Sequence, residues 1–116
     1  MASLKATITD ITKGPFNLWT LFQGGTILGV TLSPTTPLVP AAPASSLIVQ
    51  SDPSNGGTSI YYGDANITAT GPGLVIDAGS SLAKPLSPTW SIAAATIAKG
   101  YIQASANGAI VNVEVS

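Results

Sequence analysis

Ile110-Val111-Asn112-Val113-Glu114-Val115 is the stretch that decides the fold, because its side chains alternate with a period of two. In an extended strand, successive side chains point to opposite faces, so the three valines share one face while Asn112 and Glu114 lie on the other. β-branched residues also suit a pleated, half-buried surface. The stretch therefore predicts a strand with one face in a hydrophobic core and one face toward solvent.

Similar short segments recur along the chain and indicate an all-β fold. They are about four to seven residues long and rich in β-branched or aromatic residues, and turn residues such as Asn55-Gly56 and Asn107-Gly108 separate them. This pattern predicts a β-sandwich, jelly-roll-like, of roughly eight to ten strands. The expected strands are residues 4–9, 26–32, 47–50, 58–62, 65–69, 74–77, 91–95, 101–104 and 110–115. A helical turn over residues 92–99, ended by Gly100, is the alternative to the strand at 91–95.

The chain is expected to have two parts: an extended N-terminal arm, residues 1–28, and a β-sandwich domain, residues 29–116. Within the arm, Leu18, Trp19, Leu21 and Phe22 form an apolar patch. An exposed patch of this kind usually marks contact with another chain, so these four residues are the candidate partner-binding site, and the arm is a candidate for exchange between subunits. Residues 33–46 carry a proline at every third position from Pro34 to Pro43, which predicts an extended polyproline course.

The composition excludes many kinds of chemistry. The 116 residues include four basic and five acidic side chains, with a net charge of −1, and contain no His, Cys or Arg. Without His or Cys there is no Ser-His-Asp or Cys-His catalysis, no ordinary zinc site and no disulfide. Without Arg and with a negative net charge, there is little drive toward nucleic acid. We therefore expect no enzyme, no catalytic residue, no cofactor and no metal.

A membrane-spanning helix is not expected either. The uncharged stretch at residues 16–50 is interrupted by glycines and prolines, whereas a spanning helix needs about 20 continuous, mainly apolar residues.

Three local motifs have simpler explanations than a functional site. Ser81-Leu82-Ala83-Lys84 matches the S-x-x-K motif of serine β-lactamases, but Pro85 prevents the helix that this chemistry needs. Three aspartates are candidate calcium ligands, although turns that use an Asp side chain explain them more simply: Asp52, Asp64 and Asp77. The aromatic residues form either a carbohydrate-stacking platform or, more simply, core and interface packing: Trp19, Trp90, Tyr61, Tyr62 and Tyr101.

From Thr31 to Val115, the order of features resembles the small β-sandwich structural proteins of tailed-phage virions that decorate or cement capsids or cap fibres. The matching elements are turn and strand patterns rather than catalytic signatures. They are Pro37-Leu38-Val39-Pro40, a D-P-x-N-x-G turn at 52–57, an I-Y-x-G strand at 60–63, a G-x-x-L turn at 79–82, and a Y-I-x-A-S-x-x-G-x-x-V-x-V hairpin at 101–113. The sequence departs from the pattern at Ala78, where a proline is expected.

The resemblance implies a structural role on the capsid surface of a virion. The expected partner is the major capsid protein, and the expected state is a homo-oligomer, with a trimer favoured because capsids offer three-fold sites. Short uncharged side chains fit this role, since they lose little conformational entropy when an interface immobilises them. Two alternatives stay open: a tail, neck or fibre protein of the same sandwich type, and a carbohydrate-binding module.

Overall fold

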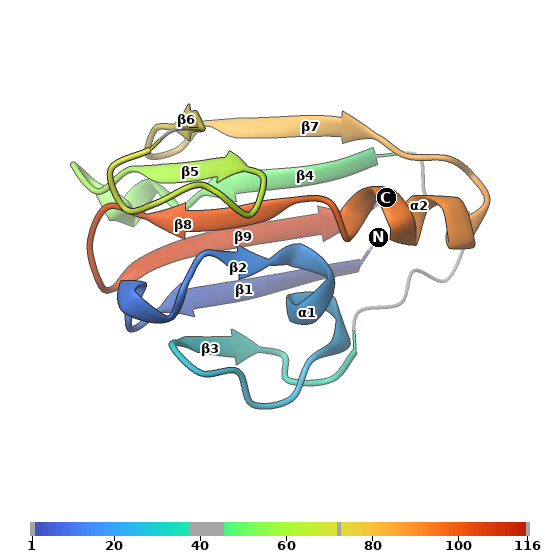
Figure 1. The fold of residues 1–116 in the computed structure, drawn as a ribbon, viewed down its shortest axis with the longest axis horizontal. Helices are drawn as coiled ribbons and strands as arrows, with labels where there is room; N and C mark the ends of the chain where they lie inside the picture. Colours follow the sequence, from blue (N-terminus) through green and yellow to red (C-terminus); the bar gives the residue numbers. More distant parts are fainter. Residues whose placement is uncertain (1, 38–45, 72, 116) are drawn as a thin grey trace.

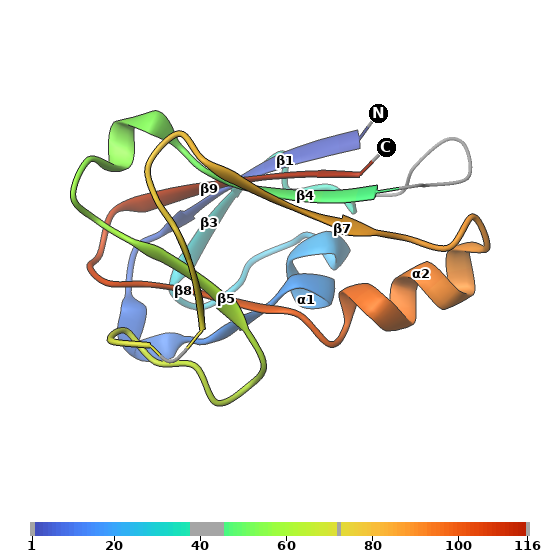
Figure 2. The same ribbon diagram turned by 90° about the horizontal axis from the view of Figure 1, so that it is seen from above.

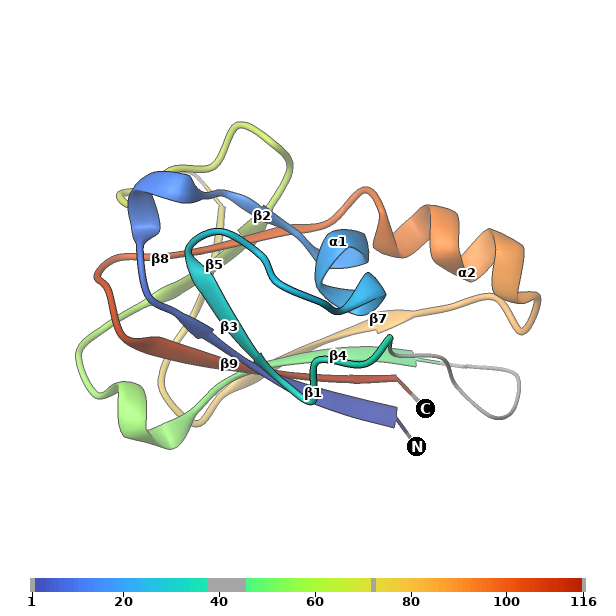
Figure 3. The same ribbon diagram turned by 90° about the horizontal axis from the view of Figure 1, so that it is seen from below.

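The computed structural model describes residues 2–37, 46–71 and 73–115, which form two antiparallel sheets packed face to face. Figures 2 and 3 show the two layers edge-on. The first sheet has the order β3-β1-β9-β4-β7 and the second β2-β8-β5-β6. The all-β sandwich that the sequence predicts is thus confirmed. The polyproline course predicted for residues 33–46 falls mostly on residues 38–45, which lie outside the described ranges.

Strands form in most of the expected segments, and short helices lie between some of them (Figure 1). The strand predicted at residues 65–69 is wrong, because only isolated bridges form there, and β2 and β7 were not predicted. Nine strands occur in the described residues. They are β1 (Ala2–Ile8), β2 (Phe16–Asn17), β3 (Val30–Ser33), β4 (Ser46–Ser51), β5 (Ile60–Gly63), β6 (Leu74–Ile76), β7 (Ser81–Pro85), β8 (Tyr101–Ala104) and β9 (Ala109–Val115). The helices are α1 (Leu18–Gln23) and α2 (Trp90–Ile97), with 3₁₀ turns at Ile11–Lys13 and Pro53–Asn55.

The C-terminal strand β9 lies at the centre of the five-stranded sheet, as its strict alternation suggests. It pairs with β1 along the whole of Ala2–Ile8 and with β4 from Leu47 to Ser51. Its valines face the core and are almost completely buried, while Asn112 and Glu114 lie on the outer face. A strand flanked on both sides and buried on one face contributes both ladder hydrogen bonds and apolar area to the fold.

The N-terminal segment is part of the sandwich, which differs from the arm that the sequence predicts for residues 1–28. Strand β1 occupies the second position of the five-stranded sheet, between β3 and β9. Its inward side chains Leu4, Ala6 and Ile8 are buried against the opposite sheet. Alternation in residues 4–9 is local information, whereas pairing with a strand more than a hundred residues away is a long-range contact that no local pattern reveals.

The stretch predicted as a strand at residues 91–95 is helical, so the alternative reading of this region is the correct one. Helix α2 spans Trp90–Ile97, and its buried residues Ala93 and Ile97 are four positions apart on one helical face. The consecutive alanines favour helix over strand. Within the described ranges, no helix has the length and apolar character that crossing a bilayer requires.

The D-P-x-N-x-G turn at residues 52–57 fastens the end of β4 to β9. The side chain of Asn55 pairs with the backbone of Ile110 as a strand would: its Nδ2 donates to the Ile110 carbonyl and its Oδ1 accepts from the Ile110 N–H, both at 2.8 Å. The Asp52 carboxylate accepts from Ser54 N–H at 2.9 Å and from Asn112 Nδ2 at 3.0 Å. These bonds, that from Asn112 first, lower the pKa of Asp52 from 3.8 to about 2.

This lowered pKa makes stability depend on acid in a predictable direction. A carboxylate with a lower pKa in the folded state stabilises the fold above its unfolded pKa near 4, and that contribution is lost as the pH falls toward 2. We expect the free energy of unfolding to decline less steeply between pH 4 and pH 2 in Asp52→Asn than in the wild type. Urea unfolding at several pH values checks this. Asp77→Asn is the charge-matched control, because the Asp77 side chain makes no hydrogen bond within the described part of the chain. Equal slopes in wild type and Asp52→Asn would contradict the assignment.

Candidate functional site

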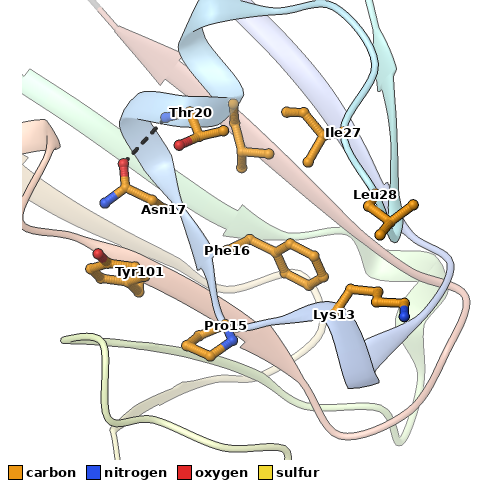
Figure 4. A pocket seen from close by; sticks show the side chains of 9 residues that line it. Lys13, Pro15, Phe16, Asn17, Thr20, Ile27, Leu28 and Tyr101 are labelled. Carbon is orange, nitrogen blue, oxygen red and sulfur yellow. Dashed lines mark hydrogen bonds between the residues drawn. The ribbon is translucent and has the colours of Figure 1, made fainter.

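An apolar groove runs along β2, the edge strand of the four-stranded sheet, and we call it the β2 groove. Its volume is about 320 Å³. Figure 4 shows the Phe16 ring between Tyr101 on one side and Leu28 on the other. The lining residues are Lys13, Pro15, Phe16, Asn17, Thr20, Leu21, Ile27, Leu28 and Tyr101.

One wall of the groove is α1, whose short sequence carries clear helix signals. The Asn17 Oδ1 accepts from Thr20 N–H at 3.2 Å and so caps the first turn (Figure 4), and Gly24 ends the helix at a φ of +73°. The Asn17 Nδ2 donates to the Ala98 carbonyl at 2.8 Å, which ties this wall to the end of α2. Asn17 therefore links the start of α1 to the end of α2 on this side of the groove.

The opposite wall is the turn Ile27-Leu28-Gly29-Val30, which presents Leu28 to solvent. Val30 N–H donates to the Ile27 carbonyl at 3.2 Å, and Gly29 takes a φ of +85° that favours glycine. The Gly29 carbonyl accepts from Thr9 N–H at 2.8 Å, so the turn is fastened to the end of β1. The turn geometry explains Gly29 but places no demand on the side chain of residue 28. Leu28 is nevertheless apolar and 73% exposed.

The electrostatic character of the groove is weak. Within the described part of the chain, Lys13 is the one charged residue that lines it. The neighbouring Asp10 carboxylate accepts from Thr12 Oγ1 at 2.6 Å and from Thr12 N–H at 3.0 Å, and these bonds lower the pKa of Asp10. Because its lining is mostly apolar, including Ile27 and Leu28, the groove is suited to an apolar contact rather than to acid–base chemistry.

The four residues predicted to bind a partner come together, but most of them face inward. Leu18, Leu21 and Phe22 have at most 1% of their surface exposed and belong to the core. Their i, i+3, i+4 spacing is that of the buried face of a helix. In this fold their own chain already covers these three side chains, so they offer little surface to a partner.

Trp19 is the partly exposed member of the four. Its ring lies 6.4 Å from that of Phe22 and 5.9 Å from that of Trp90, measured between centroids. Figures 2 and 3 show α1 and α2 side by side at the end of the sandwich where β1 begins and β9 ends. The Trp19–Trp90 contact therefore joins the two helices that close this end.

Sequence reasoning missed the β2 groove, although one signal pointed to it. Leu28 precedes a glycine in a tight turn, a position where a polar residue is ordinary and a leucine is not. The other lining residues come from separate segments, 13–21, 27–28 and 101, and only the fold brings them together.

The other candidate sites do not assemble as functional clusters in the structure. Asp52 and Asp64 each accept a hydrogen bond from the N–H two residues later, which confirms the turn roles expected of them. Ser81 and Lys84 lie on the strand β7 rather than on a helix. Among the described residues, no three His, Cys, Asp or Glu side chains gather as a possible metal site.

The aromatic residues do not share one stacking platform. Tyr62 is buried with 8% exposure, and Tyr61, the next residue on β5, points to the opposite face of the sheet. Trp90 packs against Trp19, and Tyr101 lines the β2 groove. No protein-family model, curated protein or solved structure matches this chain.

Proposed function

We propose that this chain is a structural protein of a tailed-phage virion, which decorates the capsid surface by binding the major capsid protein and stabilises the head. The observation that carries the proposal is Leu28, an exposed leucine held on a firm turn at the mouth of an apolar groove. Covering such a surface with a permanent neighbour removes apolar area from water, and the few charges nearby add little desolvation cost.

The strand order supports the jelly-roll part of this proposal. With β3 set aside, the sheets are β1-β9-β4-β7 and β2-β8-β5-β6. The remaining eight strands then pair from the two ends of the chain inward: β1 with β9, β2 with β8, β4 with β7, and β5 with β6. A rolled double Greek key, an architecture that viral capsid proteins use, would give this order, which supports the proposed jelly roll. Strand β3 is an addition at the edge beside β1.

A count of copies per particle tests the proposed location. Quantitative mass spectrometry of purified virions is the measurement, and a major capsid gene beside the coding sequence would support the same context. We expect hundreds of copies of the chain per virion, the number for a decoration protein that assembles as a homotrimer at three-fold sites. About a dozen copies would instead indicate a neck, tail or fibre protein, and absence from the particle would overturn the virion assignment.

Substituting Leu28 tests the proposed contact surface. We expect Leu28→Ser to weaken binding to capsids that lack this protein by about 10- to 100-fold, the effect of no longer burying one leucine. Co-sedimentation with such capsids measures the binding. Ile92→Ser is the matched control, because Ile92 is also exposed, at 57%, but does not line the groove. Unchanged binding by Leu28→Ser would exclude the β2 groove as the contact surface.

A further inference from the structure

A second groove lies between β7, an edge of the five-stranded sheet, and β6, an edge of the four-stranded sheet, and we call it the lysine groove. It has a volume of about 470 Å³ and is bounded by β5, the edge strands β6 and β7, and the end of α2. Figure 1 shows β6 and β7 along one long side of the molecule and β3 along the opposite side. The lining residues are Tyr62, Gly63, Gly73, Leu74, Lys84, Thr96 and Lys99.

The lysine groove concentrates positive charge in a chain that has little of it. Two of the four lysines, Lys84 and Lys99, line it, and among the described residues no Asp or Glu lines it. The other two lysines have aspartates close by: Lys13 acts on Asp10 and Lys5 on Asp52, lowering the pKa of each carboxyl. In the described part of the chain, Lys84 and Lys99 therefore share one concave surface that no carboxylate side chain lines.

Lys84 is held inside the groove by its position on the strand. It pairs in register with Leu47, whose side chain is buried, so the two side chains lie on the core-facing side of the sheet. Its Nζ lies 5.6 Å from the centroid of the Tyr62 ring on the opposite sheet. A cation over an aromatic face is attracted to it, which fixes the ammonium group at the groove rather than leaving it free in solvent.

The remaining lining gives the groove an apolar rim. Leu74 is 56% exposed and lies on β6, the edge strand of its sheet. Gly63 and Gly73 pack closely against the Ile67 side chain, and a Cβ at Gly73 would come within 3.0 Å of the Tyr62 carbonyl oxygen. Two cations beside an apolar rim suit a ligand that carries carboxylates next to apolar groups.

We infer that the lysine groove binds an acidic segment of a partner polypeptide, with a carboxylate on Lys84 and Lys99 and an apolar side chain against Leu74. Charge complementarity argues for the carboxylates, since both ammonium groups can donate charge-assisted hydrogen bonds. Nucleic acid is disfavoured, because two lysines would release few counterions and the chain as a whole is negative. The inference is independent of the capsid assignment.

A peptide titration tests the inference on the intact protein. The probe is the synthetic peptide acetyl-Glu-Leu-Glu-Leu-Glu-amide, followed by amide NMR signals of the isotope-labelled chain, and the comparison peptide has Gln in place of each Glu. We expect the acidic peptide to shift signals of residues 62–63, 73–74, 84 and 96–99, and the Gln peptide to bind at least about tenfold more weakly.

Two double variants of equal net charge separate the groove from general electrostatics. Lys84→Gln with Lys99→Gln is expected to weaken binding of the acidic peptide at least about tenfold, whereas Lys5→Gln with Lys13→Gln leaves it within about twofold. If the first pair unfolds the protein, the exposed Lys99→Gln alone serves and is expected to weaken binding. Equal binding of both peptides, equal losses in the two double variants, shifts that map outside the groove, or equal binding of inorganic phosphate would each overturn the inference.

Discussion

Deleting residues 1–28 is expected to unfold the protein. The deletion removes β1 from between β3 and β9, so both neighbours lose their ladder partner. It also removes six large core side chains, namely Leu4, Ile8, Phe16, Leu18, Leu21 and Phe22. At about 1.5–3 kcal/mol for each buried side chain, the loss is comparable with the whole stability of a domain, roughly 5–15 kcal/mol. Circular dichroism and thermal unfolding of the 29–116 fragment measure the outcome.

A pair of substitutions within β1 gives the same test without a deletion. Ala6 is completely buried and Lys5, the next residue, is exposed. Ala6→Asn places an amide in the core and is expected to cost roughly 3 kcal/mol or more, whereas Lys5→Asn is expected to stay within about 0.5 kcal/mol. If residues 1–28 were a separate arm, both variants and the deletion would keep the melting temperature of the intact sandwich.

Phe22→Ala is expected to be the most destabilising of the single substitutions in α1. Phe22 is 1% exposed and its ring stacks with that of Trp19. Truncating a buried phenylalanine to alanine costs about 3–5 kcal/mol, because contacts are lost and a cavity is left. For a chain of this size the melting temperature should fall by roughly 10–20 °C, measured by calorimetry.

Leu28→Ala is the control for Phe22→Ala, because it also truncates a large apolar residue but at an exposed position. We expect its melting temperature to stay close to that of the wild type. A Phe22→Ala protein that melts like the wild type would show that this part of the chain does not pack in the core. That outcome would restore the expectation that the segment is a partner-binding arm.

The strands that could be predicted from sequence are those whose pattern is local. The alternation in β9 and β1 and the turn residues between strands indicate a sandwich before any pairing is known. Strand β7 was missed because Leu82 and Lys84 both face inward, so its sequence does not alternate between apolar and polar. The lysine is tolerated there because its ammonium group lies over Tyr62 at the open edge.

The segment at 18–22 shows why a correct residue list can lead to the wrong site. Leu18, Leu21 and Phe22 form a real apolar cluster, and the sequence shows it. An apolar cluster has two explanations, burial in its own core or contact with a partner, and only the folded position of α1 decides between them. The helix signals were present, since Asn17 precedes the helix and Gly24 ends it.

Neither groove could be predicted from sequence, because each gathers residues from distant segments. Tyr101 pairs with Asn17 where β2 and β8 run side by side, and the Lys84 ammonium group lies over the Tyr62 ring of the opposite sheet. Only the β2 groove depends on the N-terminal segment, because the lining residues of the lysine groove all lie between residues 62 and 99. Residues 13–28 supply every lining residue of the β2 groove except Tyr101, so that groove exists only if the N-terminal segment is part of the sandwich.

Amide hydrogen exchange of the intact protein tests most directly whether the N-terminal segment is part of the sandwich, because it needs no substitution and no partner. If β1 is a central strand, the amides of residues 4–8 that pair with β3 or β9 should exchange as slowly as those of β4 and β9, at the rate set by global unfolding. Exchange of residues 4–8 near the rate of an unstructured peptide, while β4 and β9 stay protected, would contradict the account and leave residues 1–28 as an arm.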